Sequence, residues 1–143
     1  MILTDVNVLV YAFRVDMPRH AEVRRWFDKM IRGEAVFGVS PLALSGLVRI
    51  TTNRKIFRTP NSLEEVFGFC SDLLDQPHCR IIEPGERHWQ IFSAICHESD
   101  ISGPRVSDAW FAALAIENGC QWVTLDRDYA RFPGLDWSVP GQT

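Results

Sequence analysis

Three aspartates of this chain lie at the borders of apolar segments. Asp5 lies inside the apolar run that opens the chain, Asp126 ends a second apolar run, and Asp108 begins a strongly apolar helical segment. An ionised carboxylate in such surroundings is costly unless it is paired or bound to a cation. Converging carboxylates also repel one another, and a hard divalent ion such as Mg²⁺ or Mn²⁺, which prefers oxygen ligands, relieves that repulsion. The acids therefore predict a metal site that binds phosphate oxygens and activates water.

Each acid also has a structural interpretation. The helix dipole alone favours Asp108 in a first helical turn. Asp126, with Asp128 two residues later, could form a simple turn. Asp5 is the hardest to explain in structural terms, because apolar residues surround it in the sequence.

Short apolar runs alternate with amphipathic segments, which is typical of an α/β fold whose parallel sheet is covered on both faces. Strands are expected at residues 2–4, 35–39, 80–82, 122–125 and 135–139. Helices are expected at residues 8–13, 19–32, 41–52, 86–98 and 106–118, and after a capping-box pattern at Ser62 and Glu65. Ligands of such sheets bind at the carboxyl ends of the strands. Asp5 and Asp126 should therefore emerge at one edge, where the helix bearing Asp108 could face them.

Hydrophobic periodicity predicts which helix faces are buried. The helix after Ser62 is expected to bury Leu63, Val66, Phe67, Cys70, Leu73 and Leu74, and the segment 86–98 is expected to bury Trp89, Phe92 and Ile95. Core packing is the simplest role for most aromatic residues. Four on the early helices could instead receive an apolar segment of a partner: Trp26, Phe27, Phe67 and Phe69.

The chain has 143 residues, 46% hydrophobic and 23% charged, as expected of one globular domain spanning residues 1–143. Its net charge of −3 does not suggest a bulk nucleic-acid binder. The segment 49–58 is nevertheless locally basic and contains no acid, with Arg49, Arg54, Lys55 and Arg58. Such a stripe could bind phosphates. The alternatives are a solvated loop and, for Arg49, an ion pair with a buried carboxylate.

The four cysteines lack the paired spacing of a structural zinc site and are expected to be reduced thiols. No apolar run is long enough to span a membrane, and the first segment lacks the basic start of a signal peptide. A cytoplasmic protein is therefore expected.

Around the acids the sequence resembles the PIN-domain superfamily, in particular the VapC-type toxins of bacterial toxin–antitoxin systems. The matching segments are 2–9, 107–115 and 123–135, together with 20–22, 40–44 and 47–53. Each segment is a weak signal alone, but their order over nearly the whole chain makes the resemblance fairly specific.

The resemblance implies a three-layer α/β/α sandwich with a central parallel sheet. It implies an endoribonuclease that depends on Mg²⁺ or Mn²⁺ and cleaves structured RNA such as tRNA or rRNA. A cognate antitoxin and a homodimer are the implied protein partners.

The implied site residues are carried over by their motifs. Asp5, Asp108 and Asp126 match the acids that hold the metal, and Asp128 matches an acid beside the third. Asn7 and Thr124 match polar positions that line the same pocket. They join Arg49, Arg54 and Lys55 as candidate substrate-binding residues.

One position departs from the family pattern. Many relatives carry a glutamate on the helix after the second strand, where this chain has Gly46. The site could then hold three acids plus Asp128, or bind its ion more weakly. A catalytically weak or inactive PIN module that binds RNA or a protein is therefore the first alternative.

Two further functions can be weighed on the same residues. An aspartate-based phosphotransferase usually has a second acid two residues after the first, where this chain has Asn7, and a lysine after a later strand. A Rossmann-type nucleotide binder needs a glycine-rich loop after the first strand, and the sequence has none there. The metal-dependent nuclease accounts best for the acids.

Overall fold

Five short parallel strands form the centre of the computed structural model, which describes residues 1–141. They are β1 (Ile2–Thr4), β2 (Phe37–Val39), β3 (Cys79–Ile81), β4 (Gln121–Val123) and β5 (Trp137–Ser138). Their order across the sheet is β3-β2-β1-β4-β5. The central strands β1 and β4 pair in parallel, with Thr4 opposite Val123, so Asp5 and Thr124 leave the sheet side by side. Of the predicted domain, residues 142–143 lie outside the described part.

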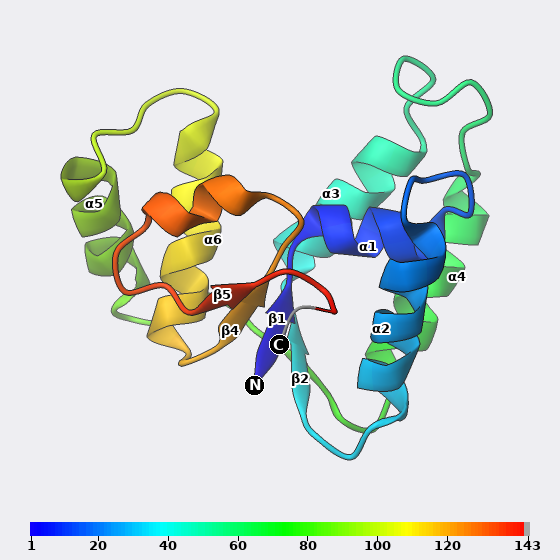
Figure 1. The fold of residues 1–143 in the computed structure, drawn as a ribbon, viewed down its shortest axis with the longest axis horizontal. Helices are drawn as coiled ribbons and strands as arrows, with labels where there is room; N and C mark the ends of the chain where they lie inside the picture. The colour runs from blue at the N-terminus through cyan, green and yellow to red at the C-terminus, as the bar shows by residue number, and fades with distance from the viewer. Residues whose placement is uncertain (142–143) are drawn as a thin grey trace.

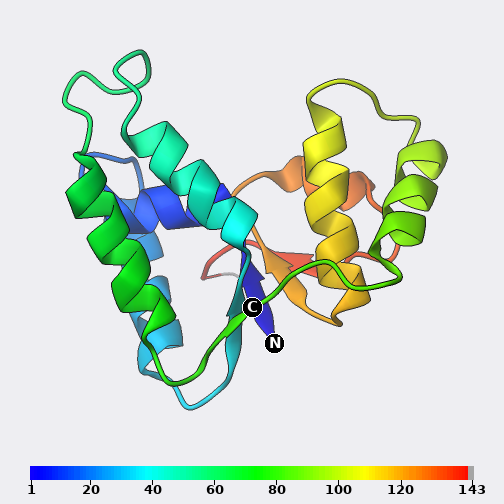
Figure 2. The same ribbon diagram turned by 180° about the vertical axis from the view of Figure 1, so that it is seen from behind.

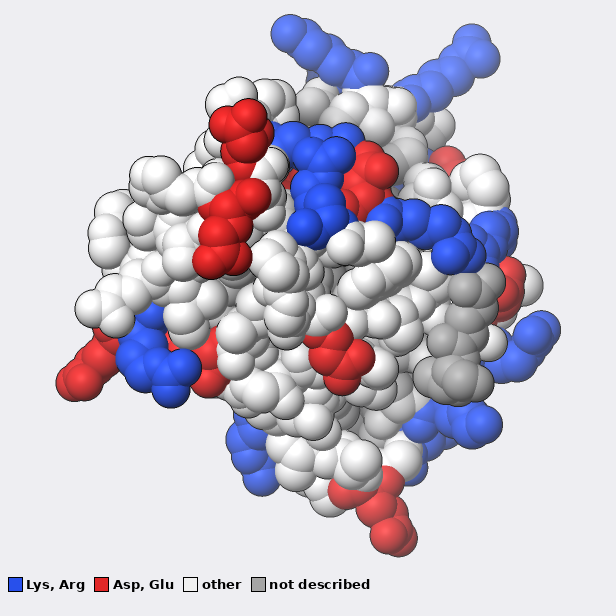
Figure 3. All heavy atoms as spheres, turned by 60° about the vertical axis from the view of Figure 1, so that its left-hand side comes forward, with Lys and Arg blue, Asp and Glu red and all other residues white. Residues whose placement is uncertain are grey.

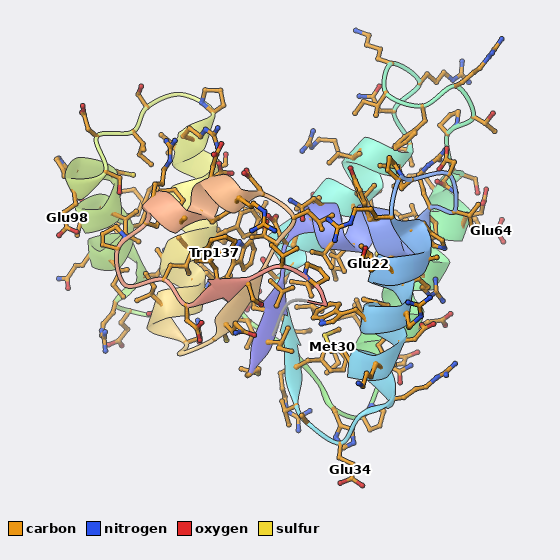
Figure 4. All side chains as sticks on the ribbon, in the orientation of Figure 1. Glu22, Met30, Glu34, Glu64, Glu98 and Trp137 are labelled. Atoms are coloured by element: carbon orange, nitrogen blue, oxygen red, sulfur yellow. The ribbon has the colours of Figure 1, made fainter. Side chains whose placement is uncertain are left out.

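Helices cover both faces of this sheet. They are α1 (Val6–Phe13), α2 (His20–Arg32), α3 (Pro41–Thr51), α4 (Leu63–Leu74), α5 (His88–Glu98) and α6 (Arg105–Glu117), with a 3₁₀ helix η1 (Arg127–Arg131) after β4. Helices α1 to α4 lie on one side of the sheet, and α5 and α6 lie on the other (Figures 1 and 2). Glu64 and Glu98 mark the two outer layers at opposite sides of the molecule (Figure 4). The predicted three-layer α/β/α sandwich is confirmed.

Local sequence signals set several element boundaries. Ser40 caps α3 with Pro41 at the first helical position, and Ser62 forms the predicted capping box with Glu65 at the start of α4. Gly119 follows α6 with a φ of +63°, a conformation that favours glycine. Helix α1 begins at Val6 rather than at residue 8, because Asp5 caps it. Most strands are shorter than predicted, because the apolar runs extend beyond the residues that pair.

Two predicted inward faces are wrong in part. On α5, Ile95 is buried, but Trp89 is 72% exposed and its ring lies edge-on to Phe92 of the same helix. On α4, the buried residues are Val66, Cys70 and Leu73, whereas Leu63, Phe67 and Leu74 are exposed. Both helices lie in outer layers, so their apolar stripes are wider than the surface that neighbouring elements cover.

The cysteines are free thiols, as predicted. Burial raises the pKa of each of them, which makes them less reactive. Within residues 1–141, no helix is both long and apolar enough to cross a membrane.

Candidate functional site

Asp5 is a buried carboxylate with a full set of hydrogen-bond partners. Its side chain is at the carboxyl end of β1 and is 6% exposed. One oxygen, Oδ1, accepts from the backbone N–H of Val6 at 2.6 Å and so caps α1. The other, Oδ2, accepts from the Thr124 hydroxyl at 2.7 Å and from the Asn7 amide at 3.2 Å. Asp5 is therefore fixed in one orientation by groups from both central strands.

Thr124 and Asn7 join the ends of β1 and β4 around this carboxylate. The Thr124 oxygen also accepts from the backbone N–H of Asp126 at 3.0 Å. The Asn7 side-chain oxygen accepts from the backbone N–H of Leu125 at 3.0 Å. Thr124 is fully buried, so its position suits holding Asp5 and the start of the Asp126 turn rather than contact with a substrate.

The surroundings of Asp5 disfavour its negative charge. Burial, opposed in part by the hydrogen bonds from Thr124 and Val6, raises its pKa from 3.8 to about 6, and the charges of Asp108 and Asp126 add to that rise. The carboxyl is ionised only above mildly acidic pH. A cation next to it would lower that cost directly.

Asp108 lies in the first turn of α6 and is half-buried. Burial and the charge of Asp126 raise its pKa. The Tyr129 hydroxyl donates to Asp108 Oδ1 at 3.4 Å. Tyr129 is itself buried, and this burial is the main reason why its pKa lies far above the ordinary value. The Tyr129 hydroxyl therefore keeps its proton and stays a donor. Sequence reasoning missed Tyr129, which appeared only as part of the third matching segment.

Arg105 is the second residue that sequence reasoning missed. Its Nη2 lies 2.5 Å from Asp128 Oδ2, and its Nη1 lies 3.4 Å from Asp108 Oδ2 and 3.6 Å from Asp126 Oδ2. Figure 3 shows basic atoms directly beside acidic ones near the top of this face. The spacing of three residues between Arg105 and Asp108 on one helix was the available signal.

The four predicted acids come to one edge of the sheet, from β1, α6 and the segment after β4. Their donor set fits a hard divalent ion, because it consists of carboxylate oxygens, and neighbouring acids contribute to the raised pKa of two of them, Asp5 and Asp108. As they stand, no three His, Cys, Asp or Glu side chains within residues 1–141 are arranged to hold a metal ion. Three of the acids are instead gathered around the Arg105 guanidinium.

The predicted basic residues are all exposed, on α3 for Arg49 and in the loop after it for Arg54, Lys55 and Arg58. None of the four takes part in an ion pair among the described residues, so the alternative ion pair for Arg49 is not formed. The loop and the start of α6 lie at the same end of the molecule, on either side of the sheet (Figure 1). Glu34 lies at the opposite end (Figure 4).

Arg14 gives this exposed loop a fixed support. Its guanidinium donates to the Thr59 carbonyl at 3.1 Å and to Asn61 Oδ1 at 2.8 Å. It also lies 3.7 Å from the centre of the Phe57 ring. The loop is thus attached at several points to Arg14 at the end of α1, the helix that Asp5 caps.

Gly46, the position that departs from the pattern implied by the resemblance, has a packing role. It is buried on α3 against α1, and a Cβ added there would lie 3.0 Å from Val6 Cγ2. The close approach of α3 to the helix that Asp5 caps leaves little room for a side chain at this position.

Comparison with known proteins agrees with this geometry. The model of the PIN-domain family matches residues 2–135. Ribonuclease VapC25 of Mycobacterium tuberculosis is 42% identical over 135 residues, which cover 94% of this chain and 95% of that protein. VapC ribonuclease Mb2897 of Mycobacterium bovis is 38% identical over 145 residues, which cover 100% of this chain and 99% of that protein.

A solved structure has the same fold. The VapBC2 structure from Rickettsia felis, bound to a DNA fragment from the promoter, gives a TM-score of 0.72 at 18% identity and covers 97% of this chain and 98% of that one. The chain therefore belongs to the PIN-domain family, and the two relatives named above are VapC ribonucleases.

Proposed function

We propose that this protein is a VapC-type endoribonuclease that depends on Mg²⁺ or Mn²⁺ and acts as the toxin of a toxin–antitoxin pair. The two relatives described above, both named VapC ribonucleases, support the activity. The observation that carries the proposal is the buried Asp5 carboxylate, held by Thr124 and Asn7 and facing the charges of Asp108 and Asp126. A purely structural aspartate has no need of two further carboxylates beside it.

Asp5, Asp108 and Asp126 are the residues that would hold the metal, with Asp128 beside them. When bound, the ion supplies polarisation of the scissile phosphate and a more acidic water. The chain's own contribution is orientation: Thr124 and Asn7 fix Asp5, and Tyr129 donates to Asp108.

Asp126 and Asp128 are both exposed enough to accept a proton from attacking water, with side chains 37% and 52% exposed. Hydrolysis in this way adds water across the P–O bond and leaves a 5′-phosphate and a 3′-hydroxyl. Analysis of the product ends would check that assignment.

The RNA backbone is proposed to lie along the basic loop. Arg49, Arg54 and Lys55, with Arg58, offer exposed cations that no described acid neutralises. Phosphate contacts position a substrate without reading its bases. The target is therefore proposed to be a structured RNA, tRNA or rRNA, recognised mainly by shape, and a cytoplasmic location follows from that substrate.

An antitoxin segment is proposed to bind the groove between α3 and α4. This groove of about 470 Å³ is lined mainly by apolar side chains, including Leu44, Val48 and Phe67. Of the aromatic residues predicted to meet a partner, Phe27 is buried, Trp26 and Phe69 pack against the core, and Phe67 remains 54% exposed. An apolar groove of this kind suits the apolar face of a helix. A homodimer is proposed from family membership alone.

The groove can be tested by co-expression with a candidate antitoxin from the adjacent gene. Phe67→Asp should abolish the complex, whereas Trp89→Asp, at a still more exposed aromatic position on α5, should leave it intact. Equal binding of the antitoxin by both variants would show that the groove between α3 and α4 is not the antitoxin site.

The activity is tested by incubating purified protein with total bacterial RNA in Mg²⁺, in Mn²⁺ and in EDTA. Discrete fragments that form with metal and not with EDTA are expected. Equal cleavage in EDTA would contradict the metal dependence, and no cleavage by folded protein in any metal would contradict the nuclease.

A non-catalytic PIN module remains the second candidate, because two observations favour it. Gly46 lacks the carboxylate that the family resemblance implies there, and Arg105 already pairs with three acids without an ion. Such a module would bind RNA with the salt dependence of phosphate contacts but would not cleave it.

A further inference from the structure

Arg105 lies where a bound cation would lie. Its guanidinium contacts carboxylate oxygens of Asp108, Asp126 and Asp128, which reach it from one helix turn and from the segment after β4. The Arg105 side chain is 38% exposed, so it can leave toward solvent without breaking core packing. Asp5 is the one predicted acid that it does not contact within the described residues.

One set of carboxylate oxygens cannot serve two cations at full strength. Asp108 Oδ2 and Asp126 Oδ2 both lie within 3.6 Å of the same nitrogen, Nη1. A divalent ion that binds these oxygens takes the position of a guanidinium nitrogen and repels the remaining charge. An arginine is charged at every working pH, so it cannot yield by losing its proton and has to move.

We propose that Arg105 is an internal counter-ion that competes with the divalent ion for Asp108, Asp126 and Asp128, and so sets the metal affinity of the site. The proposal rests on the metal-dependent function above. Arg105 offsets part of the acids' charge in the metal-free protein and moves out toward solvent when the ion binds. The absence of a ready-made ligand group among the described residues agrees with this, because Arg105 holds the carboxylates in its own geometry.

The test is direct titration of Mn²⁺ into the metal-free protein. Binding is measured by calorimetry or from the electron paramagnetic resonance signal of free Mn²⁺. Arg105→Gln removes the charge and should bind Mn²⁺ about tenfold more tightly than the parent protein. Arg105→Lys keeps a positive charge but not the forked contacts, and should give a smaller gain. Arg24→Gln breaks a similar exposed pair with Asp28 on α2 and should change nothing.

Thermal unfolding gives a second readout without catalysis. In EDTA, Arg105→Gln should unfold at a lower temperature than the parent protein, because its acids repel one another, and excess Mn²⁺ should raise its midpoint more than that of the parent.

Three results would overturn the proposal. Unchanged or weaker Mn²⁺ binding by Arg105→Gln, with normal binding by the parent, would show that Arg105 supports the ligands instead, and the metal-dependent function would stand. An equal gain in Arg105→Lys would show that charge is not the cause. No Mn²⁺ binding by the parent or any variant would remove both this inference and the metal from the proposed function.

Discussion

The two halves of the acidic site differ in how firmly they are held. On the β1 side, Asp5 is buried and accepts three hydrogen bonds from its neighbours. On the α6 side, Asp126 and Asp128 are partly exposed, and both pair with the guanidinium of Arg105, which is itself 38% exposed. The orientation of the buried half is set by the fold itself, through the hydrogen bonds to Asp5. The exposed half is the one in which the proposed exchange of Arg105 for a divalent ion would take place.

Loss of the Thr124 hydroxyl should have the largest effect on the buried half of the site, because it removes a hydrogen bond to Asp5. In Thr124→Val, Asp5 loses a hydrogen bond that lowers its pKa, so that pKa should rise above about 6. The cleavage rate should fall by about tenfold to a hundredfold at neutral pH, and the acidic limb of its pH profile should move to higher pH.

Thr51→Val is the matched control for this change. Thr51 is equally buried, and its hydroxyl donates to the Leu47 carbonyl within α3. It should lose stability to a similar extent while its pH profile stays where that of the parent protein is. Identical shifts of the pH profile in both variants would show that Thr124 has no specific role in cleavage.

The raised pKa of Asp5 predicts how metal-free stability depends on pH. Between about pH 4 and about pH 6 the folded protein holds the Asp5 proton more tightly than the unfolded chain does, so stability falls as pH rises through this window. Asp5→Asn lacks this loss. Urea unfolding in EDTA should therefore show Asp5→Asn gaining on the parent by roughly 2–3 kcal/mol across the window, and a constant difference would contradict the burial of a titrating carboxyl.

How much of this site the sequence could predict follows the same division. The position of Asp5 and Asp126 at the ends of neighbouring strands came from apolar runs and the rule for parallel sheets, both of which are local in sequence. The spacing of three residues indicates only the pair of Arg105 with Asp108; the contacts with Asp126 and Asp128 depend on where a long side chain ends in space, and no local pattern encodes that. The burial of Trp89 failed for a related reason: periodicity shows that a helix has an apolar face, but not whether another element covers it.

A glutamate at position 46 should destabilise the contact between α1 and α3. Gly46→Glu forces a side chain against Val6 and should lower the free energy of unfolding by roughly 2 kcal/mol. Gly68→Glu, on α4 with nothing within 4 Å of its added Cβ, should be neutral or slightly stabilising. Shortening the neighbour as well, in Val6→Ala with Gly46→Glu, should recover part of the loss in chemical denaturation. If Gly46→Glu alone were as stable as the parent protein, close packing against Val6 would not be the reason for a glycine at this position.

The smallest effect is expected at the exposed basic loop. Arg54→Gln with Lys55→Gln should leave the free energy of unfolding within about 0.5 kcal/mol of the parent value. The slope of log affinity for RNA against log salt concentration should fall by about one for each residue replaced. Lys29→Gln with Arg32→Gln, at the end of α2, changes the net charge equally and should leave the salt dependence unaltered. Equal reductions would mean that net charge, and not this loop, attracts the RNA.

The most direct test of the whole account compares Asp5→Asn with Glu98→Gln in Mn²⁺-dependent RNA cleavage, with thermal unfolding of both as a check of folding. Glu98 is an exposed acid at the far end of α5, so its loss of charge should leave cleavage unchanged. Asp5→Asn should stay folded and lose cleavage by at least about a hundredfold. Cleavage by folded Asp5→Asn at the parent rate would show that the buried carboxylate at the end of β1 is not the centre of the active site.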